Sequence, residues 1–121
     1  MDRLIKDKIK RRRAGRKARI RKRIHGTARM PRITVFFSNQ NVYAQMIDDD
    51  AGKTLASAST RDKSSEVKGR NKVSAKWVGA AISEKALAAG IASAVFDRNG
   101  YQYQGRVKEL ADAIREKGIK L

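Results

Sequence analysis

The sequence predicts an α/β fold, in which a mixed β-sheet packs against two helices and a basic N-terminal extension precedes the sheet. Three observations support this prediction. Three short β-rich runs follow one another with turn residues between them. Two later segments have apolar residues at helical spacing. Between Lys10 and Arg23, ten of the fourteen residues are Lys or Arg and none is acidic.

The β-rich runs predict a three-stranded antiparallel meander. The strands are expected at Ile33–Ser38, Val42–Ile47 and Lys53–Ser59. Turn-forming residues join them, because Ser38–Asn41 and Asp48–Gly52 are rich in Asn, Asp and Gly. Short connections of this kind join antiparallel neighbours.

Two helices and a fourth strand follow. Asn71 is a plausible N-cap for a helix that runs to about Ala89 and ends at Gly90. Its apolar face is expected to comprise Val73, Trp77, Val78, Ala81 and Ile82. A closing helix is expected at Arg106–Lys117, with Val107, Leu110, Ala111 and Ile114 on its apolar face.

The fourth strand is expected at Ala92–Phe96, between the two helices. Because it follows a helical crossover, it should run parallel to a strand of the meander. We place it beside the first strand, which leaves the third strand at an edge of the sheet. Asp97–Gly100 forms the next turn.

The charge divides the chain into two parts. Residues 1–32 hold 15 Lys or Arg and 2 acidic residues, a net charge of +13, whereas residues 33–121 hold 14 and 10, a net charge of +4, and together these give +17. Gly26, Thr27 and Pro31 mark the boundary. We therefore predict a basic arm at residues 1–30, disordered or helical when bound, and a globular body at residues 31–121. Such an arm is typical of proteins that bind nucleic acid.

Composition excludes several classes of protein. The chain has no cysteine and one histidine, so we expect no disulfide, no metal site and no cofactor. No apolar run approaches the length of a membrane span, and no apolar segment follows the first charges as in a secretory signal. A mitochondrial transit peptide is disfavoured because residues 1–32 contain no serine. We expect a cytosolic protein that contacts neither a membrane nor a small-molecule substrate.

Catalysis has little support in the sequence. The carboxylates of Asp48, Asp49 and Asp50 lie together in a turn, where aspartates are usually solvent-exposed turn formers. Asp97 ends the fourth strand and is expected to hold Arg98 or Arg106 in place. A metal-dependent nuclease of ribonuclease H-like fold would need carboxylates that converge from separate elements. We predict that the protein is not an enzyme.

Candidate RNA contacts fall in the arm and in three segments of the body. Tyr101 and Tyr103 lie between two glycines, where tyrosines either stack on unpaired bases or pack the loop onto the sheet. The sequence does not separate these two interpretations. The candidates in the arm and at its boundary are Lys10, Arg11, Arg12, Arg13, Arg16, Lys17, Arg19, Arg21, Lys22, Arg23, His25 and Arg32. Those in the body are Ser38, Asn39, Asn41, Arg61, Lys68, Arg70, Lys72, Arg98, Tyr101, Tyr103 and Arg106.

Several segments together resemble the bacterial form of ribosomal large-subunit protein eighteen, a family that binds 5S rRNA. The segments that carry the resemblance are Val35–Asn39, Val42–Asp49, Thr54–Thr60, Val95–Tyr101 and Gly105–Val107, with Tyr103 between the last two. The family commonly has Arg and His where this chain has Phe37 and Gln104. The resemblance implies a mixed α/β body with a flexible basic extension and no catalysis.

The resemblance also implies the partners. They are 5S rRNA, 23S rRNA in the central protuberance of the large subunit, and the neighbouring 5S-binding ribosomal proteins. The function predicted is that of a structural constituent of the cytoplasmic ribosome. The alternative is a general nucleic-acid-binding protein that uses the basic arm alone.

Overall fold

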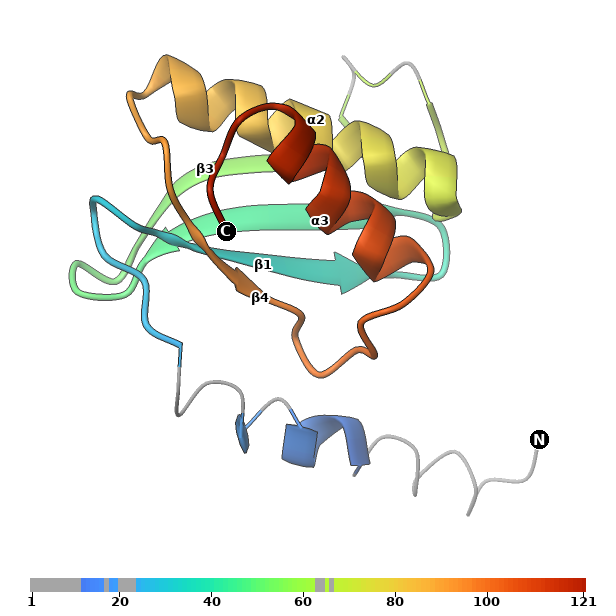
Figure 1. Cartoon of the computed structure of the whole chain (residues 1–121). Coiled ribbons are helices and arrows are strands. Elements are labelled where there is room, and N and C mark those ends of the chain that lie inside the picture. Colours follow the sequence, from blue (N-terminus) through green and yellow to red (C-terminus); the bar gives the residue numbers. More distant parts are fainter. Residues whose placement is uncertain (1–11, 17, 20–23, 63–64, 66) are drawn as a thin grey trace.

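The computed structural model describes residues 12–16, 18–19, 24–62, 65 and 67–121, and Figure 1 shows the arrangement of its elements. The body contains the strands β1 (Arg32–Phe37), β2 (Val42–Asp48), β3 (Lys53–Ser59) and β4 (Val95–Asp97) and the helices α2 (Lys72–Ala88) and α3 (Arg106–Glu116). In the arm, residues 12–16 and 18–19 are helical. Within this described part, no helix is long and apolar enough to cross a membrane.

The four strands form one mixed sheet in the order β3-β2-β1-β4. β1 and β3 are both antiparallel to β2, and β4 runs parallel to β1. The sequence prediction is therefore confirmed for the meander, for the parallel direction of the fourth strand and for the third strand at one edge. The parallel direction follows from the helical crossover through α2.

The fourth strand differs from its predicted range of Ala92–Phe96, since β4 begins only at Val95. The preceding residues pair with the C-terminal segment instead of with β1. Ala94 N–H donates to Lys120 O at 2.8 Å, and Lys120 N–H donates to Ala92 O at 2.9 Å. β4 therefore begins at Val95, where the chain stops pairing with the C-terminal segment and starts pairing with β1.

Both helices pack on the same face of the sheet (Figure 1). The strands alternate as expected, with Ile33 and Val35 of β1 and Val42, Ala44 and Met46 of β2 buried on the helical side. The buried residues of α3 are Val107, Leu110, Ala111, Ala113 and Ile114. The opposite face, which carries Thr34, Phe36, Tyr43, Gln45 and Ile47, is not covered by either helix.

The buried face of α2 is only partly the predicted one. Val78 and Ile82 are buried, but Val73 is 64% exposed. Small residues outside the predicted apolar face take the place of the larger ones, namely Ser74, Ala75, Gly79 and Ser83. They allow a close approach of α3, since a Cβ atom at Gly79 would lie 2.5 Å from Leu110 O.

The helix ends agree with the prediction to within one residue. Asn71 is the N-cap of α2, and its side-chain oxygen accepts a hydrogen bond from Ser74 N–H at 2.9 Å. The chain turns after α2 at Gly90, whose φ of +78° suits glycine. The N-cap fixes the end of the loop before α2, which carries several of the candidate contacts.

Candidate nucleic-acid interface

The root of the arm is fixed to the turn between β2 and β3. Gly26 N–H donates to Asp49 Oδ2 at 2.7 Å, and Asp49 N–H donates to Gly26 O at 2.9 Å. A Cβ atom at Gly26 would lie 2.4 Å from Arg32 N, so only glycine fits at this position. The arm therefore leaves the body at a defined point.

Arg32 was a predicted RNA contact, but the structure places it inside the body. Its guanidinium donates two hydrogen bonds to Asp49, both at 2.9 Å, and one to Asp97 Oδ2 at 2.8 Å. The side chain is 8% exposed. The bonds to Arg32 lower the pKa of the Asp49 carboxyl and raise the pKa of Arg32. The geometry thus favours a structural role for Arg32.

The acidic residues perform local structural tasks. Asp97 holds Arg32, and not Arg98 or Arg106 as predicted, and its Oδ1 also accepts a hydrogen bond from Asn99 N–H at 2.9 Å. Asp48 is 7% exposed, contrary to the prediction of an exposed turn former, because its carboxylate caps the N–H groups of the next turn. Among the residues that the structure describes, no group of three acidic or imidazole side chains could hold a metal ion.

His25, the single histidine, lies at the arm root. Its Nε2 is 2.6 Å from Asp50 Oδ1, and this bond raises the pKa of His25 above 6.5. The contribution of the pair to the stability of the folded protein is therefore present below pH 6.5. It is lost as the pH rises through the pKa of His25 in the folded protein. Both side chains are more than half exposed, so the pair adds little stability.

The helical part of the arm touches the body at the turn after β4. Arg13 Nε donates to Asn99 O at 3.3 Å, and Arg16 Nε donates to Gly100 O at 2.9 Å. The guanidinium carbon of Arg13 lies 4.0 Å from the centre of the Tyr101 ring. Two arm cations are thus held next to a loop of the body that was independently predicted to contact RNA.

The two loop tyrosines have different environments. Tyr101 packs edge-on against Phe37, with ring centres 5.0 Å apart, and its hydroxyl accepts a hydrogen bond from Phe37 N–H at 3.1 Å. The packing interpretation therefore fits Tyr101, although Arg13 covers its ring. Tyr103 is 42% exposed and accepts a hydrogen bond from Arg115 at 2.7 Å. Tyr103 thus presents more of its ring to a partner.

Three predicted segments converge at the end of β1. Arg70 donates to Ser38 O at 3.4 Å, and Arg106 donates to Arg70 O at 3.2 Å. Arg106 also lies over the ring of Phe37, 4.5 Å from its centre. The residue that replaces the family's usual Arg is therefore a buried platform beneath Arg106. Gln104, the other departure, is exposed and bonds to Gln102.

The remaining body candidates divide into exposed and engaged side chains. Asn39, Arg61 and Lys72 are exposed. The others are engaged within the body: Ser38 Oγ accepts the N–H groups of the turn that follows it, Asn41 bonds to Thr60, Lys68 to Thr60 and Asp62, and Arg98 to Tyr101.

In the arm, Arg12 and Arg19 are exposed. Six further predicted contacts lie outside the described residues, namely Lys10, Arg11, Lys17, Arg21, Lys22 and Arg23.

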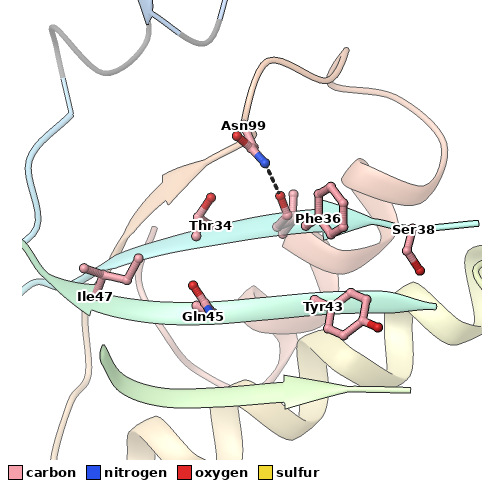
Figure 2. Close-up of a pocket in the computed structure, with 8 residues that line it drawn as sticks. Thr34, Phe36, Ser38, Tyr43, Gln45, Ile47 and Asn99 are labelled. Carbon is pink, nitrogen blue, oxygen red and sulfur yellow. Dashed lines mark hydrogen bonds between the residues drawn. The ribbon is translucent and has the colours of Figure 1, made fainter. Parts of the chain in front are cut away.

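The prediction from sequence missed the uncovered face of the sheet. A pocket of about 440 Å³ lies there, lined by Thr34, Val35, Phe36, Ser38, Tyr43, Gln45, Ile47 and Asn99 (Figure 2). The available signal was the alternation of β1, which places Phe36 opposite to Ile33, Val35 and Phe37. An aromatic residue out of phase with a core is a candidate for binding.

Comparison with known proteins gives the family. Residues 6–121 match the model of ribosomal L18 of archaea, bacteria, mitochondria and chloroplasts. Large ribosomal subunit protein uL18 of Oceanobacillus iheyensis is 55% identical over 102 residues, which cover 84% of this chain and 86% of that protein. The uL18 proteins of Clostridium novyi (55% over 109 residues, 89% and 91%) and Symbiobacterium thermophilum (52% over 111 residues, 87% and 89%) are similarly close. The chain therefore belongs to the ribosomal L18 family, as a structural, non-enzymatic constituent of the large ribosomal subunit.

Proposed function

We propose that this protein binds 5S rRNA and helps to attach it to 23S rRNA in the central protuberance. Membership of the ribosomal L18 family supports an rRNA partner. The observation that carries the proposal is a set of four arginines that lie in two groups on the described residues. Arg13 and Arg16 of the arm lie against the turn after β4, and Arg70 and Arg106 meet at the end of β1. Guanidinium groups placed in this way suit the phosphates of a folded RNA.

The proposal assigns different tasks to the two parts of the chain. The basic arm of residues 1–30 neutralises phosphates and releases counterions, which gives affinity without sequence selection. The body of residues 31–121 selects the RNA by its shape, through the cations and polar groups of its loops. The arm contacts proposed for RNA are Lys10, Arg11, Arg12, Arg13, Arg16, Lys17, Arg19, Arg21, Lys22, Arg23 and His25.

In the body, we propose contacts from side chains that are exposed or lie at the edge of the converging loops. They are Ser38, Asn39, Asn41, Arg61, Lys68, Arg70, Lys72, Arg98, Tyr101, Tyr103 and Arg106. Arg32 is not among them, because both Asp49 and Asp97 already bind its guanidinium. The protein would perform this role in the cytoplasmic ribosome, next to the other proteins that bind 5S rRNA.

A competition gel shift tests the proposal. The protein is titrated onto 5S rRNA at two salt concentrations, with duplex RNA of equal length as competitor. We expect a complex that resists the competitor, because the body selects the folded RNA. Equal loss of the complex to competitor and to salt would instead support the alternative, a general nucleic-acid-binding protein that acts through its arm alone.

A further inference from the structure

The uncovered face of the sheet carries a pair of aromatic side chains on its two central strands. Phe36 of β1 is 46% exposed, although it is a large apolar residue. Tyr43 is its cross-strand neighbour on β2, and the two ring centres are 6.0 Å apart. Figure 2 shows both rings projecting from the same side of the sheet, between Ser38 and Gln45. Exposed rings on a sheet are platforms on which bases can stack.

The pocket beside these rings is uncharged. All of its lining side chains are neutral, and they come from β1 and Ser38 just after it, from β2 and from Asn99 in the turn after β4. Its volume of about 440 Å³ falls in the range of sites that hold small ligands. The pocket is therefore large enough for a single base and is chemically suited to one.

Two oxygens in the pocket residues lack hydrogen-bond partners among the residues that the structure describes. Asn99 is 7% exposed, and its amide nitrogen donates to Val35 O at 2.9 Å (Figure 2), but its Oδ1 accepts no hydrogen bond. Thr34 Oγ1 is also buried without a partner. A buried polar atom in this state is destabilising, so a donor from a ligand would be favourable. Both oxygens are closed to solvent, so the pocket wall must shift slightly before the donor reaches them.

Cations border the pocket on several sides. Arg13 and Arg16 lie against the carbonyls of Asn99 and Gly100. Arg70 binds Ser38 O at the end of β1, and Arg61 lies near Tyr43 and Gln45, together with Asp62. A neutral pocket bordered mainly by guanidinium groups matches a nucleotide, whose base is neutral and whose phosphates are anionic. It matches an apolar protein segment less well.

We infer that this pocket receives one unpaired nucleotide of the bound RNA. Its base stacks on Phe36 and Tyr43, while an amino or 2′-hydroxyl group donates to Asn99 Oδ1 or Thr34 Oγ1. The flanking phosphates lie against the bordering arginines. This inference rests on the proposed function and adds to it a nucleotide site on the face of the sheet, next to the converging loops at the end of β1.

The first test removes the aromatic platform. Phe36→Ala should weaken binding to 5S rRNA by about tenfold to hundredfold, which is the range for loss of one stacked base. Leu87→Ala is the matched control, because Leu87 is 44% exposed and lies on α2, at the other face of the sheet. Phe36→Leu keeps the apolar bulk without the aromatic face, so it should also bind more weakly. Thermal unfolding checks that each variant is folded.

The second test addresses the unpaired hydroxyl. Thr34→Val keeps the shape of the side chain and removes a buried oxygen that has no partner in the free protein. Its melting temperature should therefore be equal to or above that of the wild type. Its affinity for 5S rRNA should nevertheless fall by roughly twofold to tenfold, the value of one hydrogen bond. Unchanged affinity would remove Thr34 from the site.

The outcomes separate this inference from the proposed function. If wild-type protein fails to select 5S rRNA over duplex competitor, the proposed function is wrong. If wild-type protein selects 5S rRNA but Phe36→Ala binds as Leu87→Ala does, only the nucleotide site is overturned. If Phe36→Leu binds as the wild type and Phe36→Ala does not, the face makes an apolar contact with the RNA that needs no aromatic ring, and the stacked base is again overturned. Ultraviolet crosslinking of Phe36 or Tyr43 to one nucleotide would confirm the site.

Discussion

Arg32 organises the ionic interior of this domain. One guanidinium bonds to Asp49 and Asp97, which approach it from two different elements. Asp49 in turn bonds to Gly26, so the same cluster holds the root of the arm. Because the Arg32 side chain is 8% exposed, the loss of one carboxylate leaves a buried charge with fewer partners.

Because of this cluster, the stability of the folded protein should depend on pH in the acidic range. The folded pKa of Asp49 is lowered from 3.8, chiefly by the hydrogen bonds from Arg32. The stabilisation is therefore present above about pH 4 and is lost as the pH falls through the lower folded value. We predict that Asp49→Asn lowers the free energy of unfolding by about 1–3 kcal/mol at neutral pH, and by less in acid. Thermal unfolding of both proteins between pH 7 and pH 3 measures the difference.

Asp50→Asn is the matched control, because Asp50 lies in the same turn but its side chain is 63% exposed and, among the residues that the structure describes, bonds only to His25. Its melting temperature should change little. If the two variants lose equal stability, or if the deficit of Asp49→Asn does not shrink in acid, the Arg32 cluster is not the source of the stabilisation.

The role of Arg32 could not be predicted from the sequence. In the sequence, Arg32 follows the cationic arm and carries the same charge as the arm residues, so nothing sets it apart from them. Its partners are 17 and 65 residues away, so only the register of the sheet brings them together. Asp97 shows the same limit, since proximity in sequence favoured Arg98 and Arg106. For Tyr101 and Tyr103 the sequence allows two interpretations, because the packing of each ring depends on tertiary contacts.

At the scale of elements, regular periodicity was sufficient for most of the fold. The ranges of β2, β3 and α3 agree closely with the alternation and helical spacing of their residues. The pattern failed where contacts depend on small or distant residues. α2 buries Ser74, Gly79 and Ser83, and none of these is marked by hydrophobicity. β4 is short because Ala94 pairs with Lys120.

The crossing of α2 and α3 yields a second prediction. Gly79→Ala should lower the free energy of unfolding by about 1–3 kcal/mol, as for other overpacked sites. A Cβ atom there would lie 2.5 Å from Leu110 O and 3.0 Å from the Ala113 Cβ, so the helices must separate. Helix propensity alone favours alanine and predicts the opposite sign. Chemical denaturation of the two proteins decides between them.

Gly15→Ala is the matched control for this substitution. Gly15 is also helical, but a Cβ atom there would have no neighbour within 4 Å. The stability of the body should not fall. A Gly79→Ala protein more stable than the wild type would show that α2 and α3 can move apart at no cost.

At the scale of the whole molecule, the concentration of positive charge in the arm was the feature of the candidate site that the sequence predicted most readily. The arm begins at a fixed point, since Gly26 is bonded to Asp49 and no larger residue fits there. Farther along, Arg13 and Arg16 contact the turn after β4. The sequence predicted that the arm carries charge, but the two contacts that orient it depend on tertiary structure. The arm and the body loops therefore present their cations together.

The salt dependence of RNA binding tests this division between arm and body. If about eight phosphates are neutralised, log K should fall against log salt with a slope of roughly −6 to −7. Deletion of residues 1–24 removes the densest cations but leaves Gly26 and its bonds to Asp49, so the body should stay folded. We predict weaker binding to all RNAs and a clearly shallower slope, measured by fluorescence anisotropy across salt concentrations. Lys76→Ala, which removes an exposed cation of α2, should leave the slope nearly unchanged. An unchanged slope after the deletion would show that the body, and not the arm, neutralises the phosphates, because each released counterion contributes to the slope wherever its cation lies.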